Sequence, residues 1–361
     1  MSAALAPVSI VVRSMDRPTL PRALASIFAQ TLKPREIIVV AACGRQHRAL
    51  PIATDGIVVR LVLPSDGKER LPRAEAANAG LRAATSEWIG FLDDDDELLP
   101  NHLVSLLPAA QAALTRKDAA RRVTYALTQG VDAEGKNTDV YGRSFTRVKI
   151  WESTIMTIMS ALVHRSLITD GCAFDETLPI HEDWDFWIQC AQKTDFHYVE
   201  TITSVWHGAE GDSGCGFGAN LHDARYREVQ QLVQAKWKTT RENTLSKIAQ
   251  VSREAVVANS RGDVAMAIKL SQTVLRQDPE NVNAANLLGI ISMHRGDLVS
   301  AHQLLTVAIK NGTPHFGLFY NMGLIEDARG QSGQAQEWYR KAHALNSEHP
   351  DLQRKLKAKA E

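Results

Sequence analysis

Hydrophobic and polar positions divide the chain into a first half that alternates strands with helices and a second half that is helical. Short hydrophobic runs rich in β-branched residues recur in the first half, at 8–12, 36–40, 57–63 and 88–92. Between them, residues 20–30 and 70–84 place hydrophobic or small residues at helical spacing. This alternation favours a mostly parallel sheet covered by helices, the Rossmann-like α/β class.

From about residue 221 the strand pattern ends, and a repeat with a period of 34 residues follows. The matching positions are Gly262, Gly296 and Gly330, then Ala267, Ala301 and Ala335. This spacing resembles the tetratricopeptide repeat, in which small residues let two antiparallel helices pack closely. The resemblance implies an all-α solenoid.

These patterns predict three parts: an N-terminal domain at 1–220, a helical linker at 221–247, and three repeats with a capping helix at 248–361. A helical solenoid either offers a groove to a protein partner or only stiffens the molecule. The sequence leaves both open, since it indicates the scaffold and not the ligand.

An acidic string follows the strand expected at 88–92. It runs Asp93-Asp94-Asp95-Asp96-Glu97, and such carboxylates cannot be buried without partners because like charges repel. Alternation would put Asp93 and Asp95 on one side and Asp94 and Asp96 on the other. Two carboxylates at this edge of an α/β sheet are typical of a Mg²⁺ or Mn²⁺ site. We also expect Asp96 or Glu97 to serve the N-terminus of a helix beginning near residue 100.

Taken in order, these segments resemble the GT-A fold of family 2 glycosyltransferases. The resemblance extends through 160–163, 174–176 and 181–185, and covers about the first 210 residues. It implies transfer of a sugar from a nucleotide-diphosphate sugar, most simply a UDP-sugar, to an acceptor hydroxyl with inversion. The acceptor would be a surface glycan, as in polysaccharide biosynthesis, or a protein.

The resemblance also assigns roles to single residues. Asp93 would contact the ribose or sugar of the donor, and Asp95, in the family's DxD motif, would bind the divalent cation, Mn²⁺ or Mg²⁺. His207 would complete the metal shell, although a lone histidine is often structural. Asp183 would be the general base that takes the acceptor's proton. Glu182 and Asp185 are the alternatives for that role.

The chain departs from the family after the second strand, where residues 41–44 lack the usual acidic side chains. Recognition of the nucleoside is therefore expected from the backbone, Asp66 or Arg13. Arg73, one helical turn before Ala77, is expected to replace the family's helix arginine.

Composition narrows the classes of partner. Lys and Arg number 41, and Asp and Glu also number 41, so the formal net charge is zero and nothing favours nucleic acid. The four cysteines form no CxxC pair, which disfavours structural zinc. No apolar run reaches the length of about 20 residues that spans a bilayer. We expect a cytoplasmic protein, or one attached peripherally to the inner face of a membrane.

The sequence thus predicts a soluble, metal-dependent, inverting glycosyltransferase with a C-terminal repeat domain. The alternative is a non-catalytic scaffold, in which a degenerate transferase domain accompanies repeats that bind partners. Retention of Asp93, Asp95 and Asp183 favours the enzyme.

Overall fold

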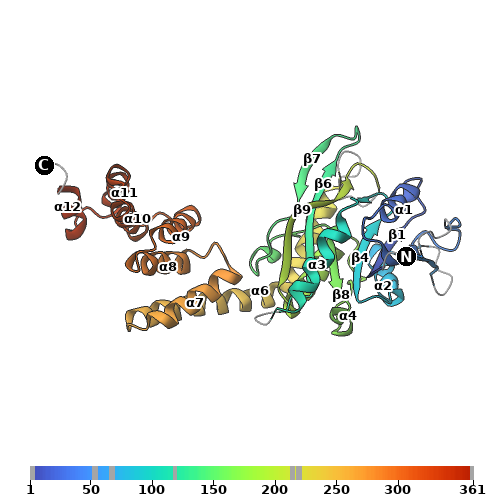
Figure 1. Cartoon of the computed structure of the whole chain (residues 1–361), viewed down its shortest axis with the longest axis horizontal. Helices are drawn as coiled ribbons and strands as arrows, with labels where there is room; N and C mark the ends of the chain where they lie inside the picture. The colour runs from blue at the N-terminus through green and yellow to red at the C-terminus, as the bar shows by residue number, and fades with distance from the viewer. Residues whose placement is uncertain are drawn as a thin grey trace. The chain divides into compact units, whose positions relative to one another are not determined.

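The structure is a computed structural model that describes residues 5–50, 56–64, 70–116, 120–211, 216 and 222–357 (Figure 1). Contacts divide the chain into two units, Met1–Lys238 and Thr239–Glu361. Asp66 lies outside the described residues.

Within the described residues, unit 1 is built on a nine-stranded mixed sheet. The strands are β1 (Ala6–Ser14), β2 (Pro34–Ala41), β3 (Val58–Val62), β4 (Trp88–Asp93), β5 (Glu97–Leu98), β6 (Val123–Val131), β7 (Asn137–Tyr141), β8 (Ala161–His164) and β9 (Phe196–His207). Their order is β3-β2-β1-β4-β8-β6-β9-β5, with β7 paired to β6. The first four are parallel, as predicted, whereas β8 runs antiparallel to β4.

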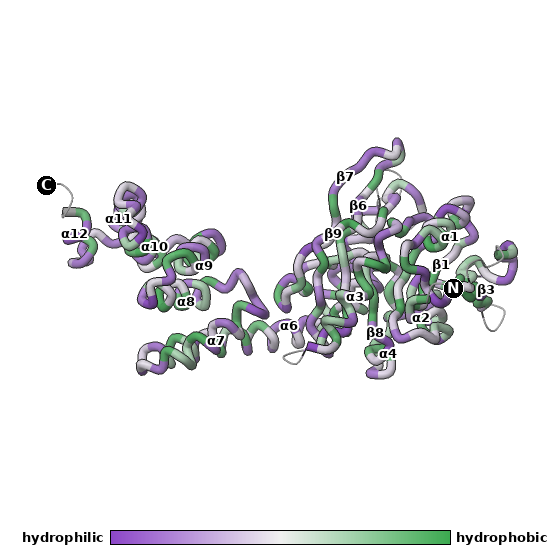
Figure 2. Tube along the Cα trace, in the orientation of Figure 1, coloured by the Kyte–Doolittle hydropathy of each residue, from purple (hydrophilic) through white to green (hydrophobic). Residues whose placement is uncertain are grey.

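Helices cover both faces of this sheet. They are α1 (Leu20–Phe28), α2 (Arg73–Ala83), α3 (His102–Leu114), α4 (Ser166–Thr169) and α5 (Glu182–Lys193), with short 3-10 turns η1 (Lys149–Trp151) and η2 (Ile158–Ser160). Ile10 and Val12 of β1 pack in one core with α1 and α3, while Val11 packs in the other with α2 and α5. Period-two alternation along a buried strand produces these two cores. Figure 2 colours each residue along the trace by its hydropathy.

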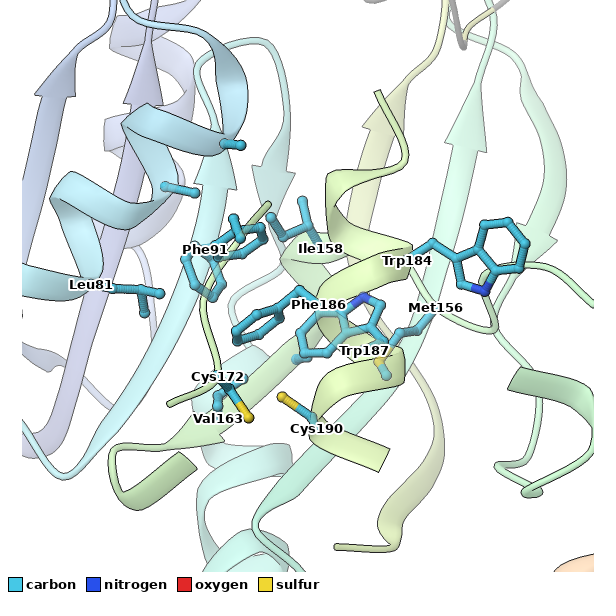
Figure 3. Close-up of a cluster of buried hydrophobic side chains, with 14 of the residues drawn as sticks. Leu81, Phe91, Met156, Ile158, Val163, Cys172, Trp184, Phe186, Trp187 and Cys190 are labelled. Atoms are coloured by element: carbon cyan, nitrogen blue, oxygen red, sulfur yellow. The ribbon is translucent and has the colours of Figure 1, made fainter. Parts of the chain in front are cut away.

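An aromatic cluster fixes α5 against the sheet (Figure 3). Phe186 of α5 stacks on Phe174 with ring centroids 4.3 Å apart, and Phe174 meets Phe91 of β4 edge-on at 5.4 Å. Trp187 is fully buried in the same core. Interlocked aromatic rings of this kind hold a helix in a defined position.

Unit 2 consists of helices that recur with the predicted period. α6 (Asp223–Ser260) begins in unit 1 and continues into unit 2. It is followed by α7 (Val264–Gln277), α8 (Val282–His294), α9 (Leu298–Asn311), α10 (Phe316–Ala328), α11 (Ser332–Leu345) and α12 (Pro350–Lys357). α7, α9 and α11 begin at intervals of 34 residues, and so do α8, α10 and α12.

Glycine at fixed positions makes the turns of this repeat. Gly262, Gly296 and Gly330 have φ angles of +81°, +82° and +76°. This left-handed conformation costs other L-residues free energy, so glycine is favoured just after a helix ends. In the first two turns the next residue, Asp263 or Asp297, caps the following helix through its side chain.

None of the described helices combines the length and the hydropathy that a membrane span requires.

Candidate active site

Two adjoining cavities open at the C-terminal end of β4. Their volumes are about 480 and 330 Å³, and both are lined by Arg73, Asp93 and Asp95. This is the edge of the sheet at which α/β proteins bind ligands.

Four charged side chains, Arg13, Arg73, Asp93 and Glu182, lie where the cavities meet, and we call them the charge cluster. Arg13 and Asp93 are paired positions of the parallel strands β1 and β4. Arg13 Nε and Nη2 donate to the two oxygens of Asp93 at 2.6 and 2.8 Å, and Nη1 donates to Glu182 at 2.7 Å. Arg73, at the start of α2, donates to the same two carboxylates, at 3.0 Å to Glu182 and 3.3 Å to Asp93.

The charge cluster keeps its two acids ionised. Burial alone would raise the pKa of Asp93, but Arg13 and Arg73 lower it to about 2. Burial would also raise the pKa of Glu182, but Arg73 and Arg13 lower it below its ordinary value. Two arginines against two carboxylates give a closed, charge-balanced arrangement, in which each bond is charge-assisted.

Asp94 ties the end of β4 to the loop that follows β1. Its buried carboxylate accepts hydrogen bonds from the Met15 backbone N–H at 2.7 Å and from Arg17 Nη1 at 2.6 Å. The strand ends at Asp93, and a turn follows at once. Asp93 and Asp95 lie together as expected, but the grouping of Asp96 with Asp94 is wrong, because it assumed an extended chain.

The turn brings Asp96, not only Asp95, beside Asp93. One carboxylate oxygen from each of the three lies within 4.8 Å of the other two. Burial and neighbouring carboxylates raise the pKa of Asp95 to about 6, and they raise that of Asp96 well above its ordinary value. Three crowded carboxylate oxygens, two of them from acids outside the charge cluster, are a fitting donor set for a hard divalent cation.

His207, at the end of β9, pairs with Glu97. Its Nε2 lies 2.8 Å from Glu97 Oε1, and its backbone N–H donates to Asp96 at 3.0 Å. Among the described residues, the three-carboxylate group does not include its ring. The helix-capping role expected for Asp96 or Glu97 is wrong, since Asn101 precedes α3 without a side-chain cap.

The three acids at the start of α5 have different surroundings. Glu182 belongs to the charge cluster. Asp185 is fully buried and accepts hydrogen bonds from Trp237 Nε1 at 2.7 Å and from Gln189. Asp183 is half-buried and lines the larger cavity, and among the described residues its side chain accepts a hydrogen bond only from the adjacent Trp184 N–H. Burial and the nearby Glu182 raise the pKa of Asp183 to about 6.

The smaller cavity is basic. Its lining includes five arginines: Arg13, Arg17, Arg70, Arg73 and Arg225. The sequence analysis assigned Arg13 and Arg73 to the site, but nothing local in the sequence marks Arg70 or Arg225, which come from a loop and from α6. An arginine-lined cavity suits a phosphorylated ligand because guanidinium groups bind phosphate through paired hydrogen bonds.

The larger cavity is mainly apolar and aromatic away from its acidic wall. Tyr141 and Trp206 meet edge-on at 5.0 Å between ring centroids, and Met156 and Ile158 also line it. Asp183 faces this space, so a hydroxyl-bearing molecule placed here lies within reach of a carboxylate.

A mixed α/β sheet with clustered acids and a basic cavity at one edge suits a glycosyltransferase, and the family match and the glycosyltransferase-named relative assign the chain to that class. Residues 9–170 match the family described as Glycosyl transferase family 2.

Two curated proteins illustrate the similarity. One is "Uncharacterized glycosyltransferase YwdF" of Bacillus subtilis (strain 168), 25% identical over 235 residues, which are 62% of this chain and 82% of the relative. The other is "Succinoglycan biosynthesis protein ExoO" of Rhizobium meliloti (strain 1021), 36% identical over 96 residues, 26% of this chain and 27% of the relative. Among solved structures, S. aureus TarS 1-349 in complex with UDP-GlcNAc is 15% identical, with a TM-score of 0.46 over 92% of this chain and 91% of that one.

Proposed function

We propose that the chain moves a sugar from a nucleotide-diphosphate sugar to an acceptor hydroxyl with inversion, using Asp183 as general base. The observation that carries this proposal is the position of Asp183. It lines the larger cavity, which adjoins the arginine-lined one across the charge cluster.

The donor's diphosphate is assigned to the smaller cavity. Arg17, Arg70 and Arg225 line it together with the two arginines of the charge cluster. Their positive charge favours an anionic ligand, and Arg13 and Arg73 are already oriented by Asp93 and Glu182. The sugar would then lie at the junction of the cavities, beside Asp93.

Asp93, Asp95 and Asp96 would hold a divalent cation of the Mg²⁺ or Mn²⁺ type. When bound there, such a cation supplies neutralising charge to the departing diphosphate. In place of the metal ligation expected for His207 we propose a positioning role, because its ring is bonded to Glu97 and its backbone to Asp96.

Asp183 is the acid best suited to take the acceptor's proton. Glu182 is bonded to both arginines of the charge cluster, and Asp185 is bonded within the core. With a pKa of about 6, Asp183 is ionised at neutral pH and more basic than an ordinary aspartate. A base in one cavity and a leaving group in the other support attack from opposite sides, which inverts the anomeric carbon.

We propose a glycan acceptor and a role in polysaccharide biosynthesis. The Rhizobium relative, named as a succinoglycan biosynthesis protein, supports this reading. For unit 2 we propose a tetratricopeptide-type solenoid, supported by the 34-residue interval and the left-handed glycines.

The test uses a panel of UDP-, GDP-, dTDP- and CMP-linked sugars, with and without Mn²⁺. A donor that binds the native state raises the melting temperature by mass action. Asp183→Asn should keep that shift but lose turnover by a factor of about 10² to 10⁴. Asp95→Asn should lose the dependence of the shift on Mn²⁺. The matched control is Asp170→Asn, an exposed carboxylate paired with Arg122 outside both cavities. Unchanged turnover in Asp183→Asn would refute the assigned base.

A further inference from the structure

The residues two positions before and two positions after Asp183 are both held by the same distant helix. His181 and Asp185 each contact α6, at Tyr226 and at Lys236 and Trp237. All of these residues belong to unit 1.

The contact before Asp183 involves strained backbone. His181 precedes α5 with a φ of +59°, a conformation that non-glycine residues rarely adopt. Its Nε2 lies 3.3 Å from the Tyr226 carbonyl oxygen, and the two rings meet edge-on at 4.4 Å. Strained residues persist where their surroundings hold them, and they concentrate at functional sites.

The contact after Asp183 is an ion pair between the buried Asp185 and the exposed Lys236, with an added hydrogen bond. Lys236 Nζ lies 2.8 Å from Asp185 Oδ1, and Trp237 Nε1 donates to the same oxygen at 2.7 Å. Lys236 also pairs with Asp175 at 2.5 Å. Because Asp185 is fully buried, it is held only in the geometry that satisfies its charge.

The same part of α6 lies at the cavities themselves. Tyr226 lines the larger cavity, and the preceding residue, Arg225, lines the smaller one. The helix therefore reaches the proposed acceptor and donor sides at one turn, while its next turns hold Asp185.

We propose that Tyr226, Lys236 and Trp237 of α6 form a clamp that positions the Asp183 carboxylate for catalysis. Tyr226 acts through His181, and Lys236 and Trp237 act through Asp185, so Lys236 and Trp237 are positioning residues. The inference rests on the proposed role of Asp183 as base. The helix α6, which begins about 40 residues after Asp183, then sets the position of that base.

The decisive comparison is Trp237→Phe with Trp151→Phe. Phenylalanine keeps an aromatic ring but removes the indole N–H that bonds to Asp185. Trp151 is buried, its ring lies 6.4 Å from that of Trp237, and its Nε1 has no hydrogen-bond partner among the described residues. Trp151→Phe therefore removes the same atoms from a neighbouring tryptophan without removing a hydrogen bond.

We expect Trp237→Phe to lower kcat about tenfold or more while the donor KM stays within about twofold, because small displacements of a catalytic group are costly. Trp151→Phe should keep both constants within about twofold. An equal loss in both variants, or no loss in Trp237→Phe, would overturn the clamp.

A second pair of variants, at His181, tests the contact with Tyr226. This pair tests the clamp even if Trp237→Phe does not fold. His181→Ala removes the ring and its contact with Tyr226 and disfavours the positive φ, whereas asparagine tolerates positive φ and carries an amide donor. We expect the alanine variant to lose kcat and the asparagine variant to regain part of it. Equal activity in the two would overturn the proposal. Loss in Asp183→Asn without loss in the clamp variants refutes the clamp alone, whereas full activity in Asp183→Asn refutes the base.

Discussion

Asp183 gives the reaction a defined pH dependence. Burial and the neighbouring Glu182 raise its pKa to about 6, and the charges of Arg73 and Arg13 oppose that rise. A general base works only when ionised, so kcat should fall as the pH drops through about 6 and level off above it. A pH profile of kcat at saturating donor measures this. A limb near pH 4, the ordinary value for aspartate, would contradict it.

Glu36, near the N-terminal end of β2, makes the stability of the fold depend on pH. This buried carboxylate accepts hydrogen bonds from Ser9 Oγ at 2.5 Å and from the Thr85 N–H at 2.6 Å, and it pairs with Arg60. Burial opposes these bonds, yet the pKa falls from 4.5 to about 2. A depressed folded-state pKa stabilises the fold above about pH 4.5, and the gain is lost as the pH falls toward 2.

Glu36→Gln should therefore lower the free energy of unfolding by about 2 kcal/mol at pH 7. The difference from the parent protein should shrink as the pH falls from about 4.5 toward 2. Urea unfolding at several pH values measures both effects. A difference that does not change with pH would show that packing, not charge, is lost.

At the scale of elements, close packing of α10 on α11 depends on one missing side chain. A Cβ at Gly323 would lie 2.4 Å from Cε1 of Tyr339, which is a clash. The Tyr339 ring is buried and its hydroxyl donates a hydrogen bond to Asp327 at 2.8 Å. Gly323→Ala should destabilise unit 2 by about 1–3 kcal/mol through overpacking. Gly333→Ala, with nothing within 4 Å, should be neutral or stabilising by up to about 1 kcal/mol. Equal melting temperatures for the two variants would contradict this packing.

The elements that the sequence predicted correctly have strong local patterns. β1, β2 and β4 are buried on both faces and read as continuous hydrophobic runs, and the helices of unit 2 repeat with fixed glycines. Strand β7 gave no such signal, since it reads Asn-Thr-Asp-Val-Tyr and each of its residues is exposed or half-buried. A strand with so few buried positions has no periodicity to detect.

The site was predictable in its residue types and less so in its contacts. The carboxylates at the end of β4 were evident from the sequence as a run of acidic residues. The turn after Asp93 is set by the hydrogen bonds of Asp94 to the loop after β1, and no local sequence pattern encodes those bonds. The pairing of Arg13 with Asp93 depends on strand register. The contacts of α6 with His181 and Asp185 join segments about 50 residues apart, so they could only come from the structure.

At the scale of the whole molecule, each unit has hydrophobic cores of its own. The two large cores of unit 1 contain no buried residue beyond Val233, and the cores of unit 2 begin at Ala255. We therefore expect calorimetry to resolve two unfolding transitions. A bound donor should raise only the transition of unit 1, by mass action, and Gly323→Ala should lower only the other. A single transition that both changes shift together would contradict independent cores.

The charge cluster also constrains how this enzyme can change over evolutionary time. Arg13 and Arg73 each bond to both Asp93 and Glu182, so the loss of any one of the four leaves an unpaired charge in a largely buried cluster. A compensating second substitution restores neutrality, and the two effects are then far from additive. We expect the four positions to evolve as a coupled group, so that diverging relatives retain or replace them together.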